Sequence, residues 1–372
     1  MTTSNTLRVL VVDDTVVYRK IVSDLLSEVP DVEVVGSAHN GKIALAKIAS
    51  LKPDLLTLDI EMPEMDGLET LKRMKAEVPD VGAIMLSSLT HQGSEMTLKA
   101  LELGAFDFIP KPQDGTIKEN IEAVKTVLIP MLRAYARHKE IRSILRGKAL
   151  SDGDVQTITQ SVKADTSSSV RAKEKADIVA IGVSTGGPNA LAKMMPELPA
   201  DVGVPILIVQ HMPPVFTESL ATSLNAKCKI EVREAKNGEP LKPNVALIAP
   251  GGRQMKVATG TDGKTRIVRV TDDPPENSCK PSVDYLFRSV AHQYLGRATG
   301  VIMTGMGSDG SLGLKLMKRN GANIIAQSEE TCVVFGMPKG PIEDGIVDTI
   351  APLNRIAEEI CQTVRYGMRS DG

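Results

Sequence analysis

The sequence predicts an α/β protein built from two doubly wound parallel-sheet domains that are joined by a flexible linker. Short apolar segments of strand length alternate with helical segments in two separate series. A polar, Ser/Thr-rich stretch with almost no large apolar residue separates the two series. The length of 372 residues is enough for two domains, each with its own core. We therefore predict a first domain at residues 7–125, a helical extension and polar linker at 126–174, and a second domain at 175–368.

The composition narrows the class of protein. The net charge is −2 and no basic block is present, so a nucleic-acid partner is not expected. The N-terminus lacks the pattern of a secretory signal, and no apolar run approaches the ~20 residues that span a bilayer. Cys228, Cys279, Cys332 and Cys361 are scattered without a C-x-x-C pair, which indicates reduced thiols. The composition predicts a cytoplasmic protein without membrane insertion.

The first series of elements ends its strands on polar residues. Its predicted strands cover residues 7–14, 32–38, 54–60, 82–88 and 106–112, and its clearest helical segments cover 16–29 and 41–51. The polar residues that stand at the carboxyl ends of these strands are Asp13, Asp14, Asp59, Ser87 and Lys111. Because the carboxyl ends of parallel strands share one edge, we expect these side chains to lie in one crevice.

Asp13, Asp14 and Asp59 form a predicted acidic cluster at that edge. Crowded carboxylates repel each other unless a hard cation lies among them, and Mg²⁺ is the usual choice. A carboxylate beside Mg²⁺ can accept a phosphoryl group, which Lys111 and Ser87 can then contact. The alternative is a set of helix caps and solvated acids, which any one of these residues alone would favour.

The motifs VVDD, LLTLDIEMPEMDG, MLSS and IPKP together resemble the receiver domain of two-component response regulators. The resemblance implies a flavodoxin-like fold in which Asp59 is phosphorylated. It implies that Mg²⁺ is bound by Asp13, Asp14, Asp59 and the backbone carbonyl of Glu61. It also implies that Ser87 and Lys111 contact the phosphate and that Phe108 is the switch aromatic.

The joining segment has two parts. Residues 121–145 predict a long helix that is interrupted at Pro130, where we expect a kink. Residues 151–176 are polar and predict the flexible linker. A single domain would need a buried loop of this length, which compact domains rarely contain.

The second series of elements again alternates strands and helices. Its predicted strands cover residues 178–181, 204–210, 229–235, 245–250, 300–304 and 322–327, and residues 265–271 predict a hairpin or edge strand. Its predicted helices cover residues 188–198, 283–294, 311–319 and 353–364. This order predicts a second parallel sheet with helices on its faces.

Ser184 lies between the first strand and the first helix of this series. Residues 182–186 match G-x-S-x-G, the pattern of a nucleophile elbow, and Pro188 suits the first helical turn. One alternative is a glycine turn in which Ser184 and Thr185 cap the helix. Another is an anion cradle, but the spacing of G-x-G-x-x-G and a P-loop lysine are both lacking.

Ser184, His211 and Asp309 each follow a different predicted strand, so they can converge at one edge. A serine, a base that takes its proton and an acid that orients the base are what acyl transfer requires. The order Ser…His…Asp differs from that of α/β-hydrolases, so G-x-S-x-G does not imply their fold. His292 is the rival base, but it lies inside a predicted helix.

The glycine-rich loop around Asp309 offers oxyanion donors. Amides near Met306 and Gly307, and those after Ser184, can face the crevice, and one such donor stabilises a transition state by roughly 3 kcal/mol. The alternative is a plain strand-to-helix turn in which Asp309 is an N-cap.

The motifs IGVSTGGPNAL, VQHMPP, IAPGG, KPSVDYLF and MTGMGSDG resemble the catalytic domain of the chemotaxis protein-glutamate methylesterases. The resemblance implies a Rossmann-like domain with a triad of Ser184, His211 and Asp309, no cofactor, Thr185 beside the nucleophile and Met306 in the oxyanion hole. The implied substrates are γ-glutamyl methyl esters of methyl-accepting chemotaxis receptors, which yield glutamate and methanol. Deamidation of receptor glutamines is also implied. A chemotaxis histidine kinase is the implied phosphodonor.

Together the two resemblances predict an esterase that phosphorylation of Asp59 activates by uncovering Ser184. Two other readings remain. One is a receiver-controlled amidase or peptidase with another substrate. The other is a non-catalytic response regulator whose second domain binds a partner or a nucleotide; a DNA-binding output is the weakest form of this reading because no basic recognition helix is visible.

Overall fold

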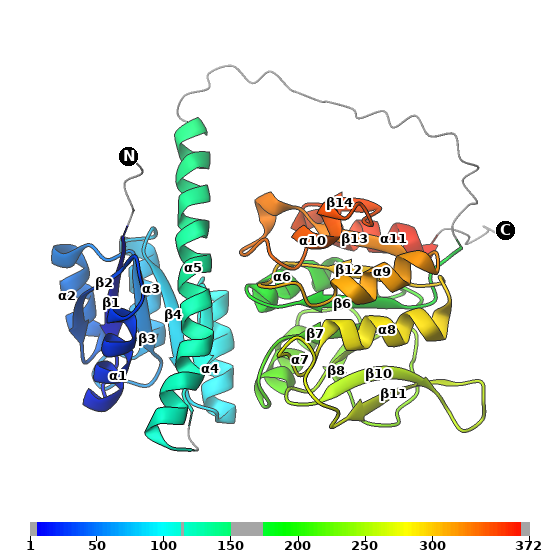
Figure 1. Cartoon of the computed structure of the whole chain (residues 1–372), viewed down its shortest axis with the longest axis horizontal. Coiled ribbons are helices and arrows are strands. Elements are labelled where there is room, and N and C mark those ends of the chain that lie inside the picture. The colour runs from blue at the N-terminus through cyan, green and yellow to red at the C-terminus, as the bar shows by residue number, and fades with distance from the viewer. Residues whose placement is uncertain (1–5, 113–114, 150–173, 366–372) are drawn as a thin grey trace.

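Two parallel sheets organise the chain in the computed structural model, one in each domain (Figure 1). The structure describes residues 6–112, 115–149 and 174–365, with the backbone alone for Ile117, residues 142–149 and Arg365. The linker predicted after the helical extension lies outside the described residues up to residue 173. The predicted fold class of two α/β parallel-sheet domains is confirmed.

The first domain is a five-stranded sheet in the order β2-β1-β3-β4-β5, with all neighbours parallel. Its strands are β1 (Leu7–Val12), β2 (Val32–Ala38), β3 (Leu55–Asp59), β4 (Gly82–Ser87) and β5 (Asp107–Pro110). Its helices are α1 (Val16–Ser27), α2 (Gly41–Leu51), α3 (Gly67–Glu77), α4 (His91–Glu102) and α5 (Ile117–Ala149). The strand order changes direction between β1 and β3, which places the ligand crevice of such a sheet beside Asp13 and Asp59.

Helix α5 continues through Pro130, where the sequence predicted an interruption. The boundary predicted at residue 125 therefore lies within this helix. Leu128 and Met131, on either side of the proline, are buried in the core of the first domain, and so is Tyr135 one turn later. Packing on both sides of Pro130 holds the helix together although proline removes a backbone donor.

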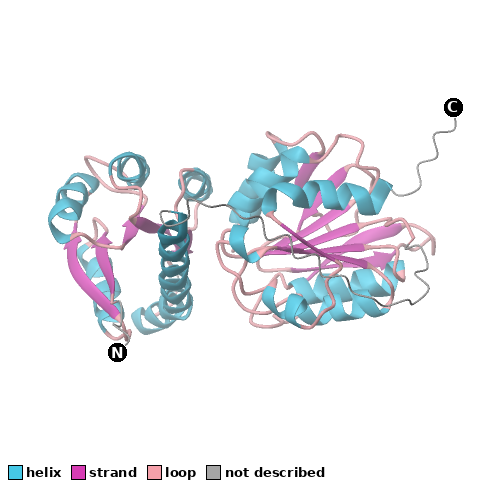
Figure 2. Cartoon of the chain, turned by 90° about the horizontal axis from the view of Figure 1, so that it is seen from above, coloured by secondary structure: helices cyan, strands magenta, loops and turns pink. Residues whose placement is uncertain are grey.

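The second domain is a seven-stranded parallel sheet in the order β14-β13-β12-β6-β7-β9-β8, with helices on both faces (Figure 2). Its strands are β6 (Val179–Val183), β7 (Ile206–Gln210), β8 (Glu231–Glu234), β9 (Val245–Ile248), β12 (Thr299–Ile302), β13 (Asn323–Gln327) and β14 (Thr349–Ala351). Its helices are α6 (Gly187–Met194), α7 (Phe216–Asn225), α8 (Val283–Tyr294), α9 (Ser311–Arg319), α10 (Lys339–Glu343) and α11 (Ile356–Arg365), with three short 3₁₀ turns at Met195–Glu197, Glu329–Thr331 and Leu353–Arg355.

A separate antiparallel hairpin pairs β10 (Gln254–Thr259) with β11 (Arg266–Thr271). Of the two alternatives predicted for residues 265–271, a hairpin or an edge strand, the structure shows the hairpin. Its first strand had no clear signal in the sequence. Within the described residues no helix is both long and apolar enough to cross a membrane.

Candidate active site

Three neighbouring strands of the second domain end at the candidate active site. β6 lies between β12 and β7, so the residues that follow these strands share one edge of the sheet. Ser184 follows β6, His211 follows β7, and Asp309 lies in the loop after β12. The chain reverses its direction of progress across the sheet at β6, which is where ligands bind in doubly wound sheets.

His211 and Asp309 are in direct contact. Nε2 of His211 lies 2.9 Å from Oδ2 of Asp309, and the Asp309 side chain is almost fully buried. The rival base His292 is exposed on helix α8. The structure therefore brings together the histidine and the acid that the sequence singled out.

The N-terminus of helix α8 holds the Asp309 carboxylate. The amides of Val283 and Asp284 donate to it at 2.7 and 3.0 Å, and the Ser282 hydroxyl donates at 2.9 Å. The first amides of a helix have no partner within the helix and carry partial positive charge, so they favour an anion. Asp309 is therefore bound as a carboxylate by a neighbouring helix and is not simply the cap of its own.

The two side chains shift each other's pKa in opposite directions. Burial acts to raise the pKa of Asp309, but the hydrogen bonds from His211, Val283 and Asn277 outweigh it and lower the pKa below its ordinary value. Burial acts to lower the pKa of His211, but the bonds with Asp309 and Cys279 outweigh it and raise the pKa. The pair therefore favours an ionised acid beside a strongly basic imidazole.

Ser184 is partly exposed, and its hydroxyl makes no hydrogen bond to any residue that the structure describes. Its amide donates to the Thr304 carbonyl at 3.0 Å, which fixes the turn against β12. The second ring nitrogen of His211, Nδ1, lies 3.7 Å from Sγ of Cys279. A serine nucleophile would give its proton to Nδ1 of His211, and in this structure the Cys279 thiol lies next to that nitrogen.

Gln210 supports the turn around Ser184. Its Nε2 donates to the carbonyls of Ser184 and His211 at 2.9 and 3.2 Å. A Cβ on Gly187 would lie 2.0 Å from Oε1 of this side chain, so only glycine fits there. Gln210 thus ties the loops of the serine and the histidine together.

Met306 and Thr185 stand where oxyanion donors were predicted. Met306 and Gly307 line the same cavity as Ser184, and so does Thr185. Among the described residues, the backbone amides of Thr185 and Met306 have no hydrogen-bond acceptor. Free amides beside a nucleophile are what an oxyanion hole needs.

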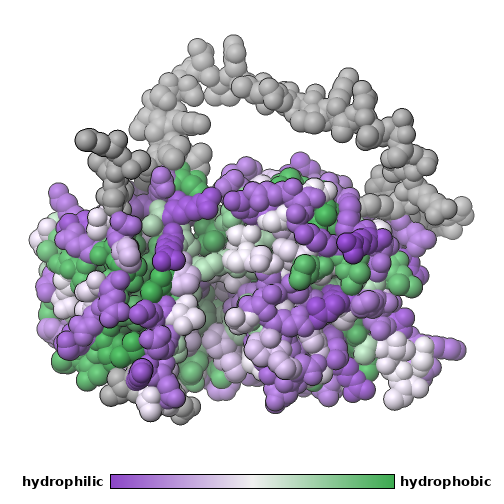
Figure 3. All heavy atoms as spheres, in the orientation of Figure 1, coloured by the Kyte–Doolittle hydropathy of each residue, from purple (hydrophilic) through white to green (hydrophobic). Residues whose placement is uncertain are grey.

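A cavity of about 670 Å³ lies between the two domains and contains the candidate active site. The first domain lines it with Asp107, Phe108, Pro110, Thr126, Val127, Pro130 and Met131. In the space-filling view, apolar residues are visible along the junction of the domains (Figure 3). The first domain thus faces Ser184 across this cavity.

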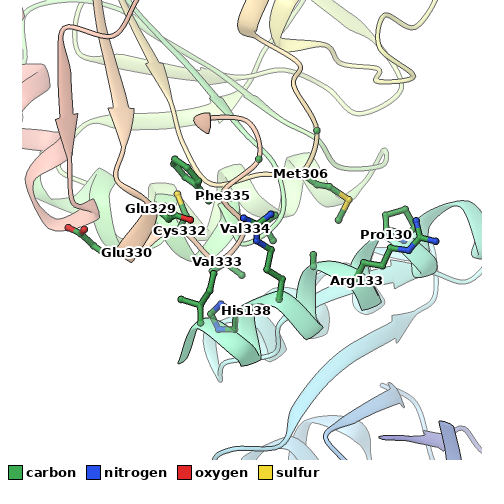
Figure 4. A pocket seen from close by; sticks show the side chains of 15 residues that line it. Pro130, Arg133, His138, Met306, Glu329, Glu330, Cys332, Val333, Val334 and Phe335 are labelled. Atoms are coloured by element: carbon green, nitrogen blue, oxygen red, sulfur yellow. The ribbon is translucent and has the colours of Figure 1, made fainter. Parts of the chain in front are cut away.

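A second cavity of about 370 Å³ separates helix α5 from residues 329–336 (Figure 4). Figure 4 shows His138 of α5 beside Val333 of the second domain, whereas Arg133 extends beside Pro130, away from Glu329 and Glu330. It shares Met306 and Gly307 with the first cavity, so it adjoins the candidate oxyanion loop.

Phe108 lies at the contact between the domains. Its ring stacks on Phe216 of α7 with centroids 4.6 Å apart. Val215, just before Phe216, has φ 73°, a conformation that a β-branched residue rarely adopts. The predicted switch aromatic therefore touches the helix that follows the His211 loop.

Helix α4 completes the contact between the domains. Ser94 and Ser219 approach with their Oγ atoms 2.6 Å apart, and Glu102 forms an ion pair with Lys227. Beside this contact, burial raises the pKa of Asp107 to about 7, against hydrogen bonds from the Phe108 amide and the Thr185 side chain. A buried carboxyl of the first domain therefore lies next to the neighbour of Ser184.

The predicted acidic cluster is present at the edge of the first sheet. Ligand atoms of Asp13, Asp14 and Asp59 all lie within 4.8 Å of one another. Lys111 lies 2.8 Å from Asp13 and 2.7 Å from Asp59. Burial raises the pKa of Asp59 to about 6, although Lys111 opposes the shift. Three carboxylates this close together carry more negative charge than Lys111 alone offsets, so their oxygens fit a hard divalent cation such as Mg²⁺.

The side chains of Ser87 and Glu61, at the same edge, make other contacts. The Ser87 hydroxyl donates to the Gly93 carbonyl at 3.2 Å and accepts from Thr97 at 2.6 Å. The Glu61 side chain is exposed and accepts from Ser88 at 3.4 Å. In this structure the Ser87 hydroxyl thus forms hydrogen bonds with residues of helix α4.

Sequence reasoning missed several residues that support the candidate site. They are Gln210, Asn277, Cys279, Ser282 and Asp284. The motif KPSVDYLF contains Ser282 and Asp284, so a serine followed by a helical pattern was the available signal of a helix N-terminus. Nothing in the sequence indicates that this terminus faces Asp309.

The two parts of the chain match two known protein families. Residues 179–360 match the CheB methylesterase family, and residues 9–122 match the response regulator receiver domain. A protein-glutamate methylesterase/protein-glutamine glutaminase of Desulfotalea psychrophila is 57% identical over 364 residues, which cover 96% of this chain and 99% of that protein. Proteins of the same name from Trichodesmium erythraeum and Bacillus subtilis are 44% and 42% identical, each over 96% of this chain and 99% of the relative.

Two solved structures from Thermotoga maritima are also similar. The CheB methylesterase catalytic domain is 40% identical and covers 51% of this chain and 99% of its own, with a TM-score of 0.49. The response regulator domain of CheB is 41% identical and covers 34% of this chain and 94% of its own, with a TM-score of 0.32.

Proposed function

The chain belongs to the CheB family of protein-glutamate methylesterases with a receiver domain, and from this premise we propose that Ser184, His211 and Asp309 are its catalytic triad. The proposed substrates are the γ-glutamyl methyl esters of methyl-accepting chemotaxis receptors. The proposed location of the protein is the cytoplasm. The proposed role is adaptation of the sensory response. The single observation that carries the proposal is the His211–Asp309 contact of 2.9 Å on the cavity that Ser184 lines.

Hydrolysis runs through an acyl-serine. His211 takes the proton of the Ser184 hydroxyl while Oγ attacks the γ-carbonyl carbon, and Asp309 stabilises the imidazolium that forms. The amides of Met306 and Thr185 donate to the oxyanion. Methanol leaves with the proton from His211, and water then cleaves the acyl-serine to give glutamate. With a receptor glutamine the same steps release ammonia.

The receiver domain is the proposed gate. It lines the cavity over Ser184, and Phe108 packs against Phe216 at the contact between the domains. A phosphoryl group on Asp59 would be contacted by Lys111 and by the Ser87 hydroxyl. The hydroxyl would then give up its hydrogen bond to the Gly93 carbonyl of helix α4. Because α4 also contacts α7, this change shifts the equilibrium toward an open, active enzyme.

Phosphorylation of Asp59 is proposed to need Mg²⁺ held by Asp13, Asp14, Asp59 and the Glu61 carbonyl. When bound, Mg²⁺ neutralises the charge that develops during phosphoryl transfer. The proposed donor is a chemotaxis histidine kinase.

The test is methanol release from methylated chemoreceptor membranes, with and without a small phosphodonor and Mg²⁺. We expect wild type to release methanol faster with the phosphodonor, and Ser184→Ala to lose about 10³-fold or more of the rate because no nucleophile remains. Ser50→Ala, an exposed serine of α2, is the matched control and keeps the wild-type rate.

The outcomes separate the chemistry from the gate. Activity that survives in Ser184→Ala would contradict the proposed nucleophile. A rate of methanol release that does not change with the phosphodonor would support the esterase activity and contradict the proposed gating by the receiver domain. Release of ammonia without methanol would point to an amidase.

A further inference from the structure

Residues 276–279 form a tight turn at the rim of the cavity. The Cys279 amide donates to the Glu276 carbonyl at 2.7 Å, and the Glu276 amide donates to the Cys279 carbonyl at 3.1 Å. The two central residues, Asn277 and Ser278, have φ of 52° and 61°. Two consecutive residues with positive φ are typical of a type I′ hairpin turn, for which asparagine is well suited and serine is not.

The turn places the Asn277 side chain between two buried acids. Its Nδ2 lies 2.9 Å from Oδ1 of Asp309 and 2.9 Å from Oδ2 of Asp284. Both carboxyl groups are nearly inaccessible, with 3% and 2% of each residue exposed. An amide nitrogen has two hydrogens, so it can satisfy one carboxylate with each.

The two acids need a donor between them. Burial raises the pKa of Asp284, and the charge of Asp309 raises it further. The other donors to Asp309, besides His211, all come from the N-terminus of α8, whereas Asn277 approaches from the cavity rim. It donates to Oδ1 together with the Ser282 hydroxyl and the Asp284 amide, whereas Oδ2 accepts from the Val283 amide and lies against His211.

The same turn reaches the other side of the imidazole. Sγ of Cys279 lies 3.7 Å from Nδ1 of His211, while Asp309 faces Nε2. A backbone conformation that most residues avoid is therefore kept at a segment that contacts both members of the pair, as is common at functional sites.

We propose that Asn277 is a positioning residue of the esterase: its side-chain amide, set by the left-handed turn, holds Asp309 ionised and directed at His211. Asn277 acts through Asp309 and does not touch the reacting atoms. This inference rests on the proposed triad.

The test compares Asn277→Gly with Asn244→Gly. Glycine keeps the positive φ at either position and removes only the side chain. Asn244 also has a positive φ, 62°, and its Oδ1 accepts from the Gly203 amide at 2.7 Å, but it does not line the cavity. It is a matched control for the loss of one side-chain hydrogen bond in the same domain.

We expect Asn277→Gly to lower kcat about 10-fold to 100-fold with KM changed less than about twofold, because the bond acts on the orientation of the base. The limb of the kcat/KM profile that reports His211 moves to lower pH, since a displaced Asp309 raises the histidine pKa less. Asn244→Gly keeps kcat and the profile. An Asn277→Gly protein with wild-type kcat and pH profile would overturn the proposal.

A readout that needs no substrate separates this inference from the proposed function. The imidazole proton between His211 and Asp309 gives a downfield ¹H NMR resonance in the wild type and in Asn244→Gly, and it moves upfield or broadens in Asn277→Gly. If even wild type released no methanol, the proposed function would fail while this resonance still decided the role of Asn277. Should Asn277→Gly not fold, Asn277→Asp takes its place, because aspartate also tolerates the turn but brings a third carboxylate.

Discussion

At the scale of single residues, hydrogen bonding decides the charge of Asp309. Its two oxygens receive five contacts, from His211, Asn277, Ser282 and the amides of Val283 and Asp284. These donors outweigh the cost of burying a carboxylate, so the acid stays ionised and raises the pKa of His211.

That pair predicts a pH dependence. His211 accepts a proton only when it is neutral, so kcat/KM increases as pH rises through its pKa. Because the pKa is raised, this limb lies above that of an ordinary histidine at about 6.5. In Asp309→Asn the limb moves to lower pH, and the plateau falls by about 10³-fold to 10⁴-fold as the tautomer is lost.

The measurement is kcat/KM for methanol release across the neutral and alkaline range, with thermal unfolding as the check on folding. Ser50→Ala keeps the wild-type profile. A limb of Asp309→Asn at the wild-type position would mean that Asp309 does not set the basicity of His211.

At the scale of elements, Gly305 joins three segments behind the nucleophile. Its amide donates to the Val334 carbonyl at 3.0 Å, and its carbonyl accepts from Gly336 and Met337. A Cβ on Gly305 would lie 2.3 Å from Sδ of Met337 and 2.8 Å from Cβ of Ser184. The loop after β12 therefore fits against the Ser184 turn only if residue 305 has no side chain.

We expect Gly305→Ala to lower the free energy of unfolding by about 1–3 kcal/mol, because the added methyl overlaps its neighbours. It also lowers kcat, because the methyl displaces Ser184. Gly340→Ala is the matched control, since a Cβ there meets nothing closer than 3.4 Å, at the Ser311 hydroxyl. Denaturant unfolding and methanol release together test this, and a Gly305→Ala protein with wild-type values of both would contradict the packing argument.

The sequence predicts those elements whose signal is local. The strand ends that carry Asp59, Ser184 and His211 follow from apolar runs and neighbouring glycine or proline. Strand β10 was missed because QMKVAT mixes polar and apolar residues. The interruption predicted at Pro130 is absent because packing on both sides of the proline holds α5 together, and the kink expected there stays a prediction. Asn277 and Gln210 were missed because their roles depend on contacts between segments far apart in the chain.

At the scale of the whole molecule, helices α4 and α7 lie against each other and hold the receiver over the catalytic domain. The Oγ atoms of Ser94 and Ser219 are 2.6 Å apart across this contact. The two side chains therefore point at each other, which is the arrangement that a disulfide between cysteines at these positions needs.

The double variant Ser94→Cys/Ser219→Cys tests the gate. Once oxidised, it is expected to hold the domains closed, so methanol release stays low even with phosphodonor and Mg²⁺. A reductant restores the response because the domains can separate again. Each single cysteine variant is the control and responds to the phosphodonor under oxidising conditions. Full activation of the cross-linked protein would mean that the enzyme works without opening this contact.

The backbone at Val215 has a consequence for the energy of that opening. Only Met212, Pro213, Pro214 and Val215 separate His211 from Phe216, the ring on which the receiver's Phe108 rests. A β-branched residue at φ 73° is strained, and strain narrows the free-energy gap to any arrangement in which the residue relaxes. Under the proposed gate, relaxation of Val215 on opening would lower the free energy that phosphorylation of Asp59 has to supply, a quantity of only a few kcal/mol.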